Sequence, residues 1–212
     1  MERFVITISR GGGCGGRILS VRLAKELGIP CYDKDILRMA SEISGIDERL
    51  FEKNDEKVSL PFWKRKGKGD GELLAPNDGG FLSPENIFRY QAYTLRELAK
   101  LHSFVVLGRA SIYILNDFPN HVKVALRAPM DYCIEQVMQQ RQLDRVAAEQ
   151  WILKTDKERR EHYSYYAGQD WDDPRNFDLV LNPANLDLET CIDLIKLCLD
   201  SKLEKNASDI QP

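Results

Sequence analysis

The sequence predicts an α/β protein in which one parallel β-sheet is covered by helices on both faces. Short runs of β-branched and apolar residues alternate along the chain with longer amphipathic or charged runs. Such alternation is typical of strands joined by helices, and these connections produce a parallel sheet. A glycine-rich loop follows the first apolar run, and arginines follow three of the expected strands.

The N-terminal quarter of the chain predicts one strand and three helices. Residues 4–9 are rich in β-forming side chains and predict a buried strand. Apolar residues recur at helical spacing over residues 17–27, and Gly28 is a suitable C-terminal stop. A short extended piece then leads into a helix that begins near Asp33, and residues 46–53 predict another short helix.

Residues 55–82 differ in composition from the rest of the chain. They are rich in glycine, proline and charge, with basic residues at 57, 64–66 and 68. A long loop of this kind in a compact domain is functional or mobile. Two interpretations stay open, a flexible solvated insertion and a lobe on the substrate side. Phe62 and Trp63 indicate that part of the segment packs onto another element.

The remainder of the chain continues the alternation of helices and strands. Ser83 is expected to cap a helix that has Pro84 at its first position. Further strands are expected within residues 103–107, 121–126 and 177–183, and further helices within 130–140, 144–168 and 187–205. Residues 1–205 thus predict a single domain, and residues 206–212 predict a disordered tail.

Length, charge and cysteine content narrow the class of protein. A chain of 212 residues can bury a sizeable core, and a net charge of −3 gives no sign of nucleic acid or an anionic membrane as a partner. Neither a membrane span nor a signal peptide is recognisable, so we expect a cytoplasmic protein. The five cysteines lack metal-ligand spacing, and no residue is predicted to be a metal ligand. The oligomeric state is open.

Three arginines predict an anion-binding edge of the sheet. Arg10, Arg109 and Arg127 each follow an expected strand. The carboxyl ends of parallel strands meet at one edge, where ligands bind in open α/β sheets. This convergence favours a negatively charged ligand.

The loop between the first strand and the first helix has the composition of a phosphate-binding loop. Glycines let backbone N–H groups face an anion, and the start of a helix adds positive potential. The stretch Gly11–Ile18 nearly matches the P-loop pattern G-x-x-x-x-G-K-[ST], with Arg17 in place of lysine and Ile18 in place of serine or threonine. Alone, such a loop could also be a flexible turn.

Several motifs in order resemble the cytidylate kinase-like family of P-loop proteins. They are ITISRGGGCGGR, LGIPCYDKDIL, VVLGRAS, LRAP and KTDKERREHYSYYAGQDWDDPRNFDLVLN, which together span residues 6–182. The resemblance implies a P-loop NTPase-type parallel sheet, a monophosphate-binding region and an arginine-bearing helical lid over residues 141–170. It also implies ATP and Mg²⁺ as cofactors and a nucleoside monophosphate, CMP or dCMP, as the acceptor.

The same resemblance implies roles for individual residues. The loop residues would hold the donor phosphates, and Arg17 is the family's usual replacement for lysine; they are Gly11, Gly12, Gly13, Cys14, Gly15, Gly16, Arg17 and Ile18. The acceptor would be bound by Arg10, Asp33, Arg109, Asp156 and Arg159. Arg141 and Arg145 would reach the transferred phosphoryl group from the lid, where positive charge stabilises the transition state together with Arg17.

Each of these roles has a simpler alternative. Arg141 and Arg145 could lie on a solvated helix face, Asp156 and Arg159 could form a surface pair, and Asp33 could cap a helix. Ile18 lacks the hydroxyl that normally holds Mg²⁺ beside the nucleotide, so ATP binding is better supported than turnover. The alternatives to a nucleotide kinase are a non-catalytic nucleotide- or anion-binding module, and a kinase for a different small acceptor that docks on residues 64–68.

Overall fold

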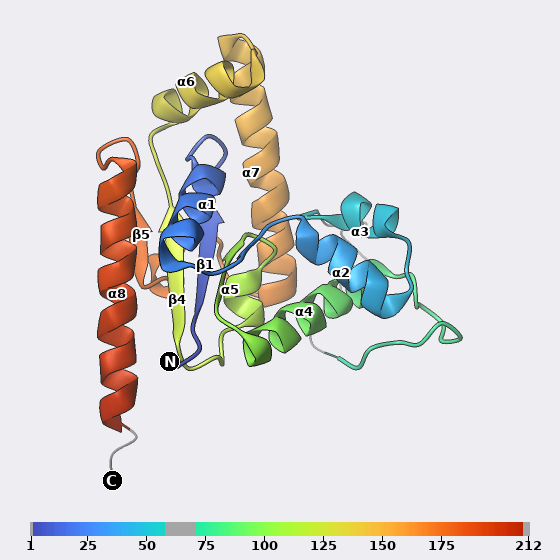
Figure 1. The fold of residues 1–212 in the computed structure, drawn as a ribbon. Coiled ribbons are helices and arrows are strands. Elements are labelled where there is room, and N and C mark those ends of the chain that lie inside the picture. The colour runs from blue at the N-terminus through green and yellow to red at the C-terminus, as the bar shows by residue number, and fades with distance from the viewer. Residues whose placement is uncertain (1, 58–70, 210–212) are drawn as a thin grey trace.

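The protein is described by a computed structural model that covers residues 2–57 and 71–209. Within these residues five strands form one parallel sheet in the order β2-β3-β1-β4-β5 (Figure 1). The strands are β1 (Val5–Arg10), β2 (Cys31–Tyr32), β3 (Phe104–Leu107), β4 (His121–Leu126) and β5 (Leu179–Leu181). The predicted parallel sheet is confirmed, and β1 lies at its centre between β3 and β4.

Helices cover both faces of this sheet, as the alternation of the sequence predicts (Figure 1). They are α1 (Gly16–Leu27), α2 (Asp35–Ser44), α3 (Glu48–Asn54), α4 (Pro84–Leu101), α5 (Ser111–Ile114), α6 (Met130–Arg141), α7 (Arg145–Ala167) and α8 (Leu188–Asp209). Successive residues of a strand point to opposite faces, so each strand contributes to two cores. On β3, Val105 and Leu107 pack with α1 and α8, whereas Phe104 and Val106 pack with α4 and α5.

A third apolar cluster joins α2 and α3 to α4 at one side of the sheet. Leu37 and Ala40 of α2 and Phe51 of α3 pack there against Ile87 and Tyr90 of α4. This cluster fixes the position of the chain that follows α3, including Asp55 and Glu56. The predicted insertion begins at this point, but its residues 58–70 lie outside the described part of the chain.

Helix α7 extends from the glycine loop to the apolar core that is formed with α4 and α5. The Asp144 side chain caps it by accepting a hydrogen bond of 2.8 Å from the N–H of Ala147. Its first half lies beside the glycine loop with α6 (Figure 1). In its second half, His162, Tyr163 and Tyr166 are buried.

Two elements differ from the sequence-based expectation. The short helix α5 had no periodic signal because it has only four residues. Helix α8 continues to Asp209, four residues beyond the expected end at Lys205, and residues 210–212 lie outside the described chain. In the described ranges, no helix combines the length and the apolar character that crossing a membrane requires.

Candidate active site

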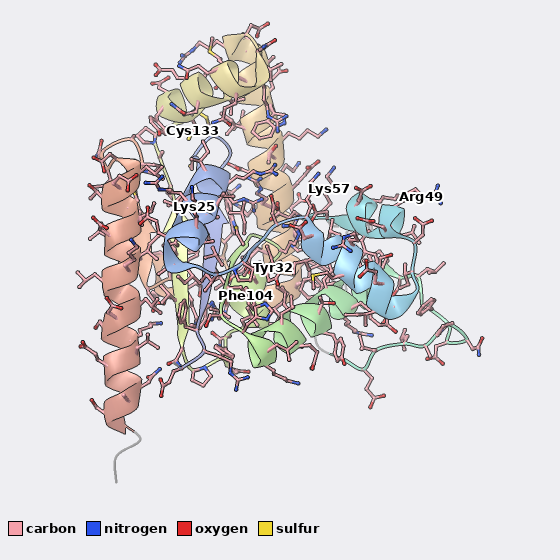
Figure 2. The ribbon with its side chains drawn as sticks, viewed as in Figure 1. Lys25, Tyr32, Arg49, Lys57, Phe104 and Cys133 are labelled. Carbon is pink, nitrogen blue, oxygen red and sulfur yellow. The ribbon has the colours of Figure 1, made fainter. Side chains whose placement is uncertain are left out.

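The glycine loop joins the end of β1 to the start of α1. Gly13 and Gly15 have φ angles of 80° and 72°, in the left-handed region that favours glycine. A Cβ atom on Gly13 would lie 2.5 Å from the carbonyl oxygen of Cys133, at the start of α6. The loop therefore packs directly on the backbone of α6, where Figure 2 labels Cys133.

Some N–H groups of this loop are used for its own architecture, and others are available to a ligand. Gly11 N–H donates to the carbonyl of Leu126 on β4, at 3.2 Å. Gly12 N–H donates to Oδ1 of Asp156 on α7, at 2.7 Å. The N–H groups of three further loop glycines have no acceptor among the described residues; they are Gly13, Gly15 and Gly16. With the N-terminus of α1, they form a cradle for an anion.

A cavity of about 360 Å³ opens above the cradle. Arg17, Lys34 and Arg141 line it together with the glycines. The guanidinium of Arg141 lies 4.0 Å from the ring centroid of Trp151, which holds the charge of this exposed side chain at the cavity edge. Arg17 is also exposed, so both cations can reach an anion bound at the loop.

Arg109 forms the floor of the same cavity and is only 2% exposed. Its guanidinium donates to Oδ1 of Asp33 at 2.7 Å, to the Leu107 carbonyl at 3.0 Å and to Oδ2 of Asp55 at 3.1 Å. Burial raises the pKa of Asp55, and the positive charge of Arg109 offsets only part of this rise. A buried guanidinium requires such partners, because an unpaired charge in this position would be costly.

Glu56 connects Arg109 to two further arginines. Arg10 donates to both carboxylate oxygens of Glu56, at 2.5 and 2.9 Å. Arg159 Nε donates to Oε2 at 3.2 Å, and the N–H of Arg109 donates to Oε1 at 3.0 Å. Burial opposes ionisation of Glu56, but the charges of Arg10 and Arg159 outweigh burial and hold the pKa of the carboxyl well below its usual range. Glu56 is therefore a carboxylate at neutral pH.

The structure thus brings most of the predicted site residues to one cavity. The residues that line it include the five glycines of the loop, Arg10, Arg17, Ile18, Asp33, Arg109, Arg141 and Arg159. Asp156 lies beside the loop at Gly12, with its Oδ1 3.7 Å from Arg159 Nη1. Cys14 is buried beneath the loop, with its sulfur 3.7 Å from that of Cys133.

Two arginines lie apart from this group. Arg145 does not line the cavity and pairs with Asp131 in an exposed position. Arg127, which follows β4, stacks 4.0 Å from the ring centroid of Trp171 and hydrogen-bonds to Asp172. These contacts direct the Arg127 side chain to the turn after α7.

Asp55, Glu56 and Trp151 line the cavity but were not predicted from the sequence. Their partners are distant along the chain, as for Glu56 and Arg159, which are separated by 103 residues. The one available signal was the pair of adjacent acids at the start of the segment of unusual composition.

Two sets of groups in the cavity bear on whether it can hold ATP and Mg²⁺. The free N–H groups and the cations around the cavity suit a polyphosphate. Ile18 is 57% exposed beside the loop but offers no oxygen to a metal. Asp33 and Asp55 line the cavity as oxygen donors, and Oδ1 of Asp55 is buried without a hydrogen-bond partner among the described residues. Mg²⁺ keeps several water and phosphate ligands, so two carboxylates are a sufficient protein contribution.

Solved structures with similar folds include two kinases and a protein described as uncharacterized. An uncharacterized protein from Eubacterium ventriosum is 24% identical, with a TM-score of 0.71, and the match covers 94% of this chain and 99% of that one. Shikimate kinase from Bacteroides thetaiotaomicron is 13% identical, with a TM-score of 0.54 and coverage of 94% and 99%. A gluconokinase from Sinorhizobium meliloti is 15% identical, with a TM-score of 0.53 and coverage of 99% and 98%. These likenesses show that the chain has the fold of P-loop kinases.

Family membership comes from the sequence itself. No curated protein matches the chain. A model of the cytidylate kinase-like family matches residues 5–185, which include the glycine loop, the arginine cluster and the whole of α7. The resemblance predicted from the motifs is therefore confirmed, and the chain belongs to the cytidylate kinase-like family.

Proposed function

We propose that the protein is an ATP-dependent kinase that phosphorylates a nucleoside monophosphate, with CMP or dCMP as the acceptor. One observation carries the proposal: a glycine loop with free N–H groups and a cluster of arginines line a single cavity of about 360 Å³. Phosphoryl transfer needs positioned phosphates and positive charge around the transferred group, with little covalent chemistry by the protein.

In this proposal the donor lies at the loop. The N–H groups of Gly13, Gly15 and Gly16 bind its phosphates, and Arg17 and Arg141 add charge from the open side. Mg²⁺ bound with ATP would neutralise charge on the β- and γ-phosphates. Asp33 and Asp55 would hold the ion, in part through water, because Ile18 cannot.

The acceptor lies on the other side of the cavity, over Arg109. Arg10, Arg109 and Arg159 provide donors for an anionic group, while Asp33 and Asp156 orient the acceptor and Arg159. Arg145 belongs to the lid and would need to move to reach the transferred phosphoryl group.

The test is a panel assay with the purified protein. Mg-ATP is incubated with CMP, dCMP, UMP or AMP, and ADP release is measured. We expect the highest rate with CMP or dCMP. Absence of turnover with all four, in a protein that binds ATP, would exclude this acceptor class. Arg17→Ala should weaken ATP binding at least tenfold, since a charged hydrogen bond contributes about 1.5–3 kcal/mol; unchanged affinity would mean that the loop is only a turn.

A second candidate is a kinase for a small acceptor that carries a hydroxyl group. It is favoured by the carboxylates of Asp33 and Asp55 in the cavity, since a carboxylate can accept the proton of an attacking hydroxyl. Shikimate and gluconate, the acceptors that the names of two structural neighbours suggest, should therefore be added to the panel.

A third candidate is a nucleotide-binding module without catalysis, which Ile18 favours. Calorimetry distinguishes it from both kinases. Tight ATP binding that does not depend on Mg²⁺, without phosphoryl transfer to any acceptor, would support this candidate.

A further inference from the structure

Glu56 is held by arginines that come from three different parts of the fold. Arg10 ends β1, Arg109 follows β3, and Arg159 lies on α7. Arg10 and Arg159 contact the one carboxylate with their guanidinium groups and Arg109 contacts it with its backbone N–H, at distances between 2.5 and 3.2 Å. Guanidinium groups match the oxygens of a carboxylate or a phosphate equally well. Glu56 therefore fills a site that is built for an anion.

Without Glu56, this anion site would be open to a ligand. Arg109 keeps Asp33 and Asp55 as partners, whereas Arg10 has no carboxylate partner other than Glu56 among the described residues. Arg159 would retain the Arg10 carbonyl, to which its Nη1 donates at 3.3 Å, and Asp156 as its carboxylate partner among the described residues, with an oxygen 3.7 Å away. Removal of the Glu56 carboxylate would thus leave two guanidinium groups facing the cavity.

The backbone of Glu56 is held in an unusual conformation. Its φ angle is 51°, in the left-handed region, which is unfavourable for a residue with a side chain. The residue lies beyond the end of α3, so the helix does not impose this angle. Strained conformations persist where surrounding contacts determine them, and here the contacts are the three arginines. Next to it, Lys57 is exposed beside α7, with its Nζ 3.8 Å from Glu158 (Figure 2).

From these observations we propose that Glu56 is an internal anion that occupies the binding site for the acceptor's anionic group and is displaced when the acceptor binds. The proposal deepens the proposed function, on which it rests for the identity of the acceptor. It makes Glu56 a determinant of acceptor affinity: the acceptor must replace a carboxylate that already satisfies Arg10 and Arg159. Only a group with at least the charge of a carboxylate can do so, which favours a phosphate ester over a neutral sugar.

Binding of inorganic phosphate tests this inference without any need for turnover. The full-length protein is first saturated with a non-hydrolysable ATP analogue, so that the glycine loop is filled, and phosphate is then titrated by calorimetry. Glu56→Gln removes the charge and keeps the size of the side chain. We expect this variant to bind phosphate at least tenfold more tightly than the wild type. Glu52→Gln is the matched control, since Glu52 is exposed on α3, and should bind phosphate as the wild type does.

Unchanged or weaker phosphate binding by Glu56→Gln would overturn the proposal, because it would mean that Glu56 only neutralises the arginines. If the variant is too unstable for calorimetry, its melting temperature is followed against phosphate concentration. Displacement predicts that phosphate raises this temperature more in Glu56→Gln than in the wild type, and an equal or smaller rise would overturn it.

The nucleotide kinase activity and the displacement of Glu56 can be tested separately. Should CMP be a substrate, Glu56→Gln should lower its KM and leave the KM for ATP unchanged. A KM for CMP that is unchanged or higher would count against displacement. Tight phosphate binding by the variant with no turnover of any nucleotide would refute the nucleotide kinase and retain the anion site.

Discussion

Asp156 accepts a hydrogen bond of 2.7 Å from the backbone N–H of Gly12, across 144 residues of sequence. The same loop position is in close contact with α7, since a Cβ atom on Gly12 would lie 3.3 Å from the Trp151 ring. The glycine loop is therefore supported by α7 as well as by its own turn.

This contact predicts the effect of changing Asp156. Asp156→Ala should leave the buried N–H of Gly12 without an acceptor and reduce the free energy of unfolding by about 1–3 kcal/mol. Asp156→Asn keeps an oxygen at the same place and should cost less. Denaturant unfolding measures stability and calorimetry measures the ATP affinity, which should fall with Asp156→Ala. Equal behaviour of the two variants would show that the hydrogen bond does not support the loop.

Gly13 and Gly15 form a matched pair for testing how the loop packs. Both have positive φ angles, so alanine is strained at either position by about 1–2 kcal/mol. At Gly15 a Cβ meets nothing within 4 Å, whereas at Gly13 it would clash with the α6 backbone at Cys133. Gly13→Ala should therefore cost about 1–3 kcal/mol more than Gly15→Ala in unfolding free energy. Equal losses would mean that α6 does not rest on the loop.

Arg141 and Arg145 should differ in their effect on catalysis. Arg141 lines the cavity, while Arg145 pairs with Asp131 at the surface. If α6 and α7 keep the same arrangement during turnover, Arg141→Ala should lower kcat at least tenfold and Arg145→Ala should change it less than threefold, because an exposed pair contributes little. Steady-state kinetics on the identified acceptor measures both. A larger loss for Arg145→Ala would show that Arg145 moves into the cavity.

His162 predicts a loss of stability in acid. It is buried against Phe88 and Tyr166, and burial lowers its pKa to about 4, with a smaller lowering by Arg109 and an opposing effect of Glu56. Since the unfolded pKa is about 6.5, the unfolded chain binds more protons between pH 6.5 and 4. The stability is thus complete above pH 6.5, and about 2 kcal/mol of it is lost by pH 5.

Comparison with His162→Gln isolates this effect. His121 is also buried, with a pKa lowered to about 3, and contributes a similar slope in both proteins. Urea unfolding at pH 7 and pH 5 should show a loss for the wild type that exceeds the loss for His162→Gln by about 2 kcal/mol. Equal losses would contradict a neutral buried imidazole.

The parts of the fold that could be predicted from the sequence depend on local patterns. The strand at Val5–Arg10, the glycine loop and the helix that Gly28 ends are each encoded by neighbouring residues, and so is the cap at Ser83. Periodicity and capping chemistry act over a few residues, which makes them readable without a structure.

The arginine–carboxylate cluster could not be read in the same way. Glu56 contacts partners 46, 53 and 103 residues away, and no spacing in the sequence marks those pairs. The arginines themselves were predicted because each follows a strand or lies in a family motif. Their carboxylate partners come from the end of α3, whose position depends on apolar packing against α4 rather than on any local pattern.

Helix α7 is long and uninterrupted. Its 23 residues contain neither glycine nor proline, so nothing in the helix favours a kink that would absorb a displacement of one end. Near the start of α7, Trp151 borders the cavity above the glycine loop, and near its end Tyr166 stacks on Phe88 with ring centroids 3.7 Å apart. Ligand binding that tilts the helix must also alter this stacking. The spectroscopic signal of Tyr166 in this distant core should therefore report occupancy of the glycine loop.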